Sequence, residues 1–264
     1  MFRPCLHRPP LPASLRIIPI HRTKSHRASF FSATACASQL QHHPPVAPAS
    51  RPKRIVIGIT GATGSVYAIR LLQILRDLEI ESHLIISKWA LATLKYETGH
   101  SEATVRALAH ASYAPRDMSA TIASGSFAHD GMIIVPCSMK TLAAVRMGFC
   151  DELIARAADV SLKEDRRLVL AVRETPLTEI HLDNMLALRR MGAVIFPPVP
   201  AFYTRPKEIG DLVEQSVGRM LDALGLATEG FPRWRGFEWE VQRRERDALQ
   251  MEERERQRVG YSCS

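Results

Sequence analysis

Short apolar runs alternate with longer amphipathic stretches between residues 54 and 224. The short runs are rich in Ile, Val and Leu and end at turn residues, a pattern typical of buried strands. They lie at Arg54–Thr60, Ser82–Ser87, Gly131–Val135, Leu168–Arg173 and Ala193–Phe196. The longer stretches have apolar residues at helical spacing and predict helices over Val66–Leu78, Lys88–Tyr96, Ser101–Ala111, Met139–Met147, Leu177–Met191 and Pro206–Leu224.

This alternation predicts an α/β fold: a single-domain Rossmann-like or flavodoxin-like parallel sheet with helices on both faces. In open sheets of this kind, ligands bind beyond the carboxyl ends of the strands. The polar residues that follow each strand are therefore the first candidates for a functional site.

The turn after the first predicted strand contains Gly58, Gly61 and Gly64. A strand, a glycine turn and a helix in succession point backbone N–H groups at the start of the helix, where a phosphate can bind. The glycine spacing is neither G-x-G-x-x-G nor a P-loop, and the second strand ends in Ser87 and Lys88 rather than in an acid for a ribose. The pattern favours a mononucleotide phosphate over NAD, with a purely structural glycine turn as the alternative.

Polar side chains also follow the later strands: Ser138, Lys140 and Thr141 after the third, Arg173 and Glu174 after the fourth, and Tyr203 beyond a proline-rich loop after the fifth. Arg156 and Lys163 are seven residues apart, which is two helical turns and predicts that they share one face. Cations, a carboxylate and a tyrosine near two helix N-termini suit two phosphate-bearing ligands held together. For each residue alone, a surface ion pair is the alternative.

The charge of the chain is unevenly distributed. The formal net charge is +8, yet the first 54 residues hold nine Lys/Arg and no acid, and the rest holds 26 Lys/Arg against 27 Asp/Glu. An acid-free leader rich in Arg and Ser resembles a mitochondrial transit peptide and predicts a mitochondrial location. A basic arm for nucleic acid is the alternative; we expect neither a nucleic-acid partner nor a membrane span.

We expect a transit peptide or disordered leader over 1–50, one catalytic domain over 51–236 and a charged tail over 237–264, helical or frayed within 240–258. After the leader, Cys137, Cys150 and Cys263 lack the spacing of a metal site or a disulfide framework, so no metal is expected. Cys137 ends a strand near the expected ligand. Packing is favoured for it over a role as a reactive thiol.

The motifs of residues 54–234 closely resemble those of the flavin prenyltransferases, which mature the cofactor of reversible aromatic-acid decarboxylases. The fungal mitochondrial members of phenylacrylic acid decarboxylase type look nearest. The motifs are Gly61-Ala62-Thr63-Gly64, Ile86-Ser87-Lys88, Tyr96-Glu97-Thr98, Pro136-Cys137-Ser138-Met139-Lys140-Thr141-Leu142, Arg156-Ala157-Ala158-Asp159-Val160, Arg173-Glu174-Thr175-Pro176-Leu177, Pro197-Pro198-Val199-Pro200-Ala201-Phe202-Tyr203 and Pro232-Arg233-Trp234.

The resemblance implies a metal-independent reaction. A dimethylallyl group from dimethylallyl phosphate, or from the diphosphate, is joined to N5 and then C6 of reduced FMN. The product, prenylated FMN, serves a partner aromatic or cinnamic-acid decarboxylase. The family also implies a large homo-oligomer, commonly a dodecamer, with sites shared between subunits.

The resemblance assigns roles to individual residues. FMN would be held by Gly61, Ala62, Thr63, Ser87, Ser138, Met139, Lys140, Thr141 and Arg173. The prenyl phosphate would be held by Arg156, Lys163, Tyr203 and Arg219. Glu174 would be the acid and base, Thr63 would lie beside N5, Glu97 would line the phosphate region of a neighbouring subunit's site, and Trp234 would flank the pocket.

Other functions remain alternatives. The same fold serves FMN-dependent cysteine decarboxylases, but none of the histidines at 83, 100, 110, 129 and 181 stands at a matched catalytic position. A non-enzymatic FMN carrier would need the glycine turn but not Arg156, Lys163, Tyr203 and Arg219. We expect no decarboxylase activity from this chain alone.

Overall fold

The computed structural model describes residues 51–234, 236–237, 240 and 242–251. The expected leader over 1–50 and the end of the expected tail lie outside these residues. Of the expected tail helix, Glu240 and residues 242–251 are helical, with exposed side chains over 242–251.

The chain builds one parallel sheet of six strands in the order β3-β2-β1-β4-β5-β6. Its elements are β1 (Arg54–Ile59), α1 (Ser65–Asp77), β2 (Glu81–Ile86), α2 (Lys88–Glu97), α3 (Glu102–Arg106), β3 (Ala111–Tyr113), the 3-10 turn η1 (Thr121–Ala123), β4 (Gly131–Cys137), α4 (Met139–Met147), α5 (Leu153–Lys163), β5 (Leu168–Val172), α6 (Glu179–Arg190), β6 (Val194–Ile195), the 3-10 turn η2 (Phe202–Thr204) and α7 (Ile209–Ala223). The predicted α/β fold is confirmed.

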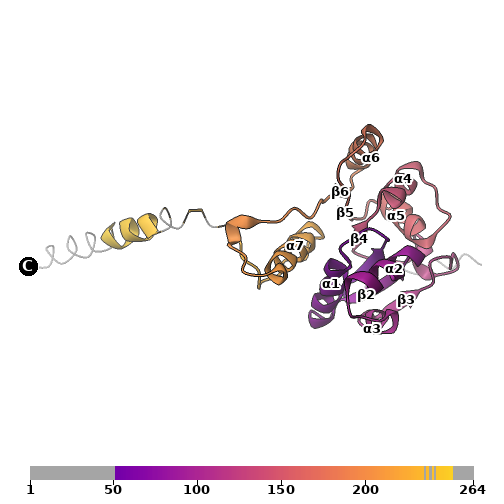
Figure 1. Ribbon diagram of the computed structural model, residues 1–264, viewed down its shortest axis with the longest axis horizontal. Helices are drawn as coiled ribbons and strands as arrows, with labels where there is room; N and C mark the ends of the chain where they lie inside the picture. Colours follow the sequence, from indigo (N-terminus) through magenta and orange to yellow (C-terminus); the bar gives the residue numbers. More distant parts are fainter. Residues whose placement is uncertain (1–50, 235, 238–239, 241, 252–264) are drawn as a thin grey trace, which may run out of the picture. The chain divides into compact units, whose positions relative to one another are not determined.

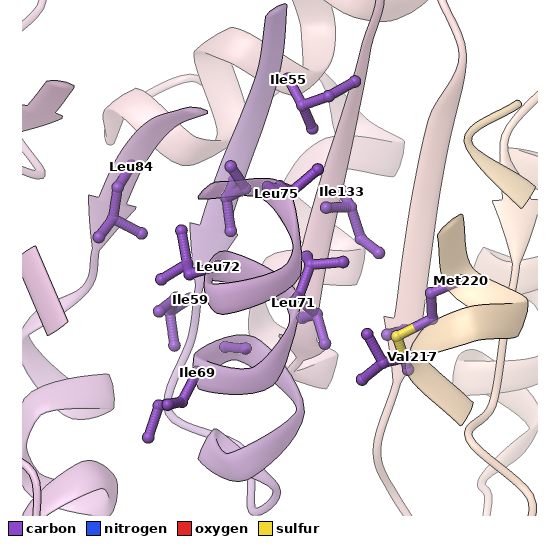
Figure 2. Packing of buried hydrophobic residues seen from close by; sticks show 14 of the residues in the cluster. Ile55, Ile59, Ile69, Leu71, Leu72, Leu75, Leu84, Ile133, Val217 and Met220 are labelled. Atoms are coloured by element: carbon purple, nitrogen blue, oxygen red, sulfur yellow. The ribbon is translucent and has the colours of Figure 1, made fainter. Parts of the chain in front are cut away.

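Each face of the sheet carries its own apolar core, because side chains alternate along a strand. On one face, Ile55, Ile57 and Ile59 of β1 pack with Leu71 and Leu75 of α1. Figure 2 shows these α1 leucines lying over the strands, with α7 beside them. On the other face, alternate residues of β1, β4 and β5 pack against α4, α5 and α6. Figure 1 shows α1 on one side of β4, with α4 and α5 on the other.

One predicted element is wrong. The helix expected over Ser101–Ala111 is a five-residue helix, α3, followed by strand β3, which pairs with β2 from His83↔Ala111 to Ile85↔Tyr113. Strand β3 is short and only half-buried, so it carries no continuous apolar run by which the sequence could reveal it. The other predicted helices and strands lie within a few residues of the observed ones.

Candidate active site

The sheet has a topological switch point between β1 and β4. The chain runs from β1 toward β2 and β3 on one side, and from β4 toward β5 and β6 on the other. Such a point leaves a crevice at the carboxyl ends of the two central strands, where ligands of open α/β sheets bind. The glycine turn follows β1, and the Ser138 segment follows β4, so both predicted FMN segments meet at this crevice.

Thr60 ties the two segments together. Its buried hydroxyl donates to the carbonyl oxygen of Pro136 at 2.6 Å and accepts from the backbone N–H of Ser138 at 2.8 Å. Both bonds cross between the ends of β1 and β4, which fixes the two turns relative to each other. Sequence reasoning treated Thr60 only as the end of a strand, because a threonine hydroxyl at a strand end carries no distinctive motif.

One face of α2 holds the glycine turn. Trp89, Thr93 and Glu97 are spaced four residues apart and therefore lie on the same side of the helix. A Cβ at Gly61 would lie 2.6 Å from the Cβ of Trp89, so only glycine fits at this approach. The hydroxyl of Thr93 donates to the carbonyl oxygen of Gly61 at 3.2 Å. The sequence did not identify Trp89 or Thr93 as supports of the turn.

The third residue of this face, Glu97, binds the start of α1. Its carboxylate accepts from the backbone N–H of Gly64 at 2.9 Å and of Ser65 at 2.8 Å. Partial burial would raise the pKa of Glu97, but hydrogen bonds from Thr63, Ser65 and Gly64 outweigh it and hold the pKa below its usual value. In this structure the chain's own carboxylate binds these N–H groups, as the structural alternative for the glycine turn would have it.

Two other helices begin at the crevice with serine caps. The hydroxyl of Ser87 accepts from the N–H of Ala90 at 3.2 Å at the start of α2, and that of Ser138 accepts from the N–H of Thr141 at 3.4 Å at the start of α4. The first N–H groups of each helix remain as donors for an anion. Lys140 lies on the exposed side of α4, where its Nζ contacts Glu152 at 3.4 Å.

Arg173 joins β5 to the glycine turn. Its Nε donates to the carbonyl oxygen of Thr63 at 3.3 Å, and its guanidinium lies 5.9 Å from the ring centroid of Tyr67 on α1. The next residue, Glu174, is exposed, and one carboxylate oxygen accepts from the N–H of Thr175 at 3.0 Å. Arg173 and Glu174 thus stand at the same crevice edge as Gly61, Ala62 and Thr63.

Arg156 and Lys163 share a helix face, as predicted, but that face adjoins the η1 segment. Arg156 donates to the carbonyl oxygen of Ala123 at 3.0 Å and to Asp159 at 2.9 Å. Lys163 is paired with Glu164, and a Cβ at Gly125 would lie 2.7 Å from its Nζ. Lys163 ends α5 just before β5 begins, so it lies toward the amino ends of the strands. Within one chain it does not join Arg173 and Glu174.

Tyr203 and Trp234 form a group with α7. Their rings meet edge to face with centroids 5.4 Å apart, and Gln215 of α7 donates to the Tyr203 hydroxyl at 3.2 Å. Together with Phe202 and Phe237 they line a groove of about 700 Å³. Arg219, one turn beyond Gln215, contacts Asp222 at 3.4 Å.

The far end of α7 lies apart from the glycine turn, whereas its start lines a pocket with Val66 of α1 and Glu97. Gly225, just after α7, closely approaches Arg167, which precedes β5. The last turn of α7, with Asp222, therefore lies toward the amino ends of the strands. One chain thus presents the predicted FMN residues at the switch point and the end of α7, with Asp222, toward the opposite ends of the strands. The expectation that all these charges surround one crevice is not met within a single chain.

Cys137 is buried, and burial raises the pKa of its thiol to about 12. The thiol therefore stays protonated and packs in the core, as favoured from sequence. Within the described residues, no cluster of three or more His, Cys, Asp or Glu side chains is placed to bind a metal. In the same part of the chain, every helix is too short or too polar to cross a membrane.

Comparison with known proteins places this geometry in a family. The family model described as Flavoprotein matches residues 46–221. The mitochondrial flavin prenyltransferase PAD1 of Saccharomyces cerevisiae is 64% identical over 187 residues, which are 71% of this chain and 77% of the yeast protein.

Two solved structures agree. AnUbiX (PadA1) in complex with FMN and dimethylallyl pyrophosphate is 61% identical with a TM-score of 0.71, and the match covers 71% of this chain and 100% of that chain. A dodecameric FMN-dependent UbiX-like decarboxylase from Escherichia coli O157:H7 is 53% identical with a TM-score of 0.68, and covers 69% and 100%. Because the chain is 64% identical to a flavin prenyltransferase and has the same kind of fold as the two solved structures, it belongs to the flavin prenyltransferase family of flavoproteins.

Proposed function

We propose that this protein transfers a dimethylallyl group from dimethylallyl phosphate, or from the diphosphate, to N5 and C6 of reduced FMN. The support is the switch-point crevice with its serine-capped helices, together with a 61% identical structure that holds FMN and dimethylallyl pyrophosphate. Membership of a family of named prenyltransferases sets aside the cysteine decarboxylase and the FMN carrier. The observation that carries the proposal is the meeting of the Gly61 turn, Ser138 and Arg173 at one strand edge.

The residues at this edge fit FMN by their chemistry. The helix starts at Ser87 and Ser138 offer backbone and hydroxyl donors to an anion, and Arg173 offers a cation beside the turn. We assign Gly61, Ala62, Thr63, Ser87, Ser138, Met139, Lys140, Thr141 and Arg173 to FMN. When bound in its reduced state, FMN supplies the nucleophile, so the protein contributes position and electrostatics.

The prenyl phosphate requires charge that one chain does not bring to this edge. Arg156, Lys163, Tyr203 and Arg219 lie on other parts of the surface. Large apolar side chains are exposed beside both groups, including Trp89, Phe202 and Ile209, which are 70%, 72% and 78% exposed. Such exposure marks surfaces for other chains. We infer that a second copy brings these residues to the crevice in a homo-oligomer, in which Glu97 and Trp234 border the pocket.

Glu174 is the proposed acid and base. It is exposed at the crevice edge next to Arg173, where a carboxylate can exchange a proton with the departing phosphate and the closing ring. A groove with the aromatic rings of Tyr203, Trp234 and Phe237 suits an allylic fragment that develops positive charge.

The leader carries a proposal about location. Residues 1–50 would direct import into mitochondria, residues 51–236 would form the catalytic domain and residues 237–264 a charged tail. The acid-free composition of the leader and a yeast relative described as mitochondrial support this location. A partner aromatic or cinnamic-acid decarboxylase would receive the product.

The direct test is an anaerobic incubation of chain trimmed to residue 51 with reduced FMN and dimethylallyl phosphate, followed by mass spectrometry of the extracted flavin. Addition of one five-carbon unit is expected, and repetition with the diphosphate identifies the donor. Unmodified flavin with both donors, despite FMN binding, would contradict the proposal and favour a carrier.

A further inference from the structure

The segment that leads to Trp234 is fastened to α7. The ring of Phe231 lies directly on Gly218, where a Cβ would be 2.1 Å from Cδ1 of the ring. The guanidinium of Arg233 lies 4.4 Å from the centroid of the same ring. The absence of a side chain at Gly218 is therefore what lets this segment approach the helix so closely.

Asp222 is contacted by two arginines unequally. Arg233 donates to both of its carboxylate oxygens at 2.8 Å and also to the carbonyl oxygen of Thr228 at 3.0 Å. Arg219, three residues before Asp222 on α7, makes a single contact of 3.4 Å and its side chain is 55% exposed. A two-point pairing is the stronger of the two, so Arg233 occupies most of the capacity of this carboxylate.

This arrangement bears on the proposed site because Arg219 is assigned to the prenyl phosphate. Without Arg233, the carboxylate of Asp222 would lack a strong partner. The nearest cation would then be Arg219, on the same face of α7. Opposite charges at i, i+3 spacing attract each other. Arg219 would then pair with Asp222 in competition with a phosphate.

We propose that Arg233 is a positioning residue, whose ion pair with Asp222 keeps Arg219 available to bind the phosphate of the prenyl donor. The inference rests on the proposed function for the identity of that donor. Arg233 itself is held by Asp222, Thr228 and the Phe231 ring, and we assign it a role through Arg219 rather than on the substrate.

The test measures binding without turnover. The oligomer is loaded with oxidised FMN, which has no nucleophile to offer, and dimethylallyl phosphate is titrated by calorimetry. The variants are Arg233→Met, Asp222→Asn and the double variant. Glu214→Gln is the matched control, because it removes an α7 carboxylate that pairs with Arg70 of α1. FMN affinity is measured for every variant.

Arg233→Met is expected to weaken prenyl-phosphate binding about tenfold, the loss typical of one charge-assisted contact. Asp222→Asn and the double variant should both bind the prenyl phosphate as the wild type does, since the competing carboxylate is gone in each. FMN affinity and the Glu214→Gln control should match the wild type. If the ion pair only fastened the Phe231 segment to α7, then Arg233→Met, Asp222→Asn and the double variant would all bind the prenyl phosphate equally weakly.

Equal affinities in these three variants, or no change in any, would overturn the inference. Should Arg233→Met fail to fold, Arg233→Lys keeps a charge on Asp222 with fewer bonds and must give an intermediate affinity. The proposed function is judged separately, by the wild-type flavin mass. A wild type that binds the prenyl phosphate but leaves FMN unmodified would contradict that function and not the ion pair's role.

Discussion

The carboxylate of Glu97 accepts a 2.8 Å hydrogen bond from the backbone N–H of Ser65, the first residue of α1. Helix α1 lacks both a side-chain cap and an acidic residue in its first turn, so this carboxylate from α2 supplies the negative charge that a helix N-terminus favours. The contact also fixes the last glycine of the turn, because Gly64 donates to the same group. An anion site expected from the glycine pattern is thus filled from within the chain.

Glu97→Gln should destabilise the protein by about 0.5–1 kcal/mol, the usual contribution of a charge at a helix N-terminus. The folded pKa of Glu97 is lowered, so its contribution is present above the unfolded value near 4.5 and is lost as pH falls through the folded value. Thermal unfolding at pH 7 and pH 4 measures this. The control is Glu102→Gln, an exposed carboxylate paired with Arg106 on α3, and the idea fails if both variants lose the same stability.

His129 should make the fold sensitive to acid. Burial, followed by the nearby charge of Arg166, lowers the pKa of this histidine from 6.5 to about 4, against smaller opposing effects of Gly131 and Asp130. The unfolded chain therefore binds a proton between about pH 6.5 and 4 that the folded chain does not, and stability falls by at most about 3 kcal/mol over that window. Urea unfolding should show that the unfolding free energy of His129→Asn falls less between pH 6.5 and pH 4 than that of the wild type. Parallel pH profiles would exclude this histidine as the cause.

Glu174→Gln should bind FMN normally yet form the prenyl adduct at least about a hundredfold more slowly, the usual effect of losing an acid–base group. The amide keeps the size of the side chain and its acceptor for the N–H of Thr175, so the loop should be unchanged. The flavin mass after timed incubation measures the rate. A variant that turns over like the wild type would remove Glu174 from the mechanism.

Arg219→Ala should weaken binding of dimethylallyl phosphate about tenfold and leave FMN affinity unchanged, since Arg219 lies on α7 away from the glycine turn. Separate titrations of the two ligands test this. Arg70→Ala, which removes a cation from α1 that pairs with α7, is the control for loss of positive charge. Equal weakening of both ligands would show that Arg219 serves the fold rather than the phosphate.

The sequence predicted the core strands well because they are continuous apolar runs with both faces buried, but its predicted helices did not include α5. It missed β3 because three residues at a sheet edge, none of them fully buried, have no such run. The meeting of the Gly61 turn, Ser138 and Arg173 could be foreseen, since the carboxyl ends of parallel strands share one edge.

The contacts made by charged residues could not be foreseen in the same way. Glu97 and Gly64 are 33 residues apart, and no local sequence pattern indicates that Glu97 binds the N-terminus of α1. Seven-residue spacing correctly placed Arg156 and Lys163 on one helix face. Spacing along a helix does not predict which segment packs against that face, here the one around η1. The resemblance to a family supplied their role, and only the fold shows that one chain does not gather them.

We propose that each active site takes its FMN residues from one chain and its prenyl-phosphate residues from another. Co-expression of Arg173→Ala and Arg219→Ala subunits tests it, because each alone lacks one half of the site. Random mixing in a symmetric oligomer should give about a quarter of sites with both halves intact. The mixture should recover about a quarter of the wild-type yield of prenylated flavin, measured by mass spectrometry, while each variant alone makes little. A mixture no more active than the two separate variants would contradict it.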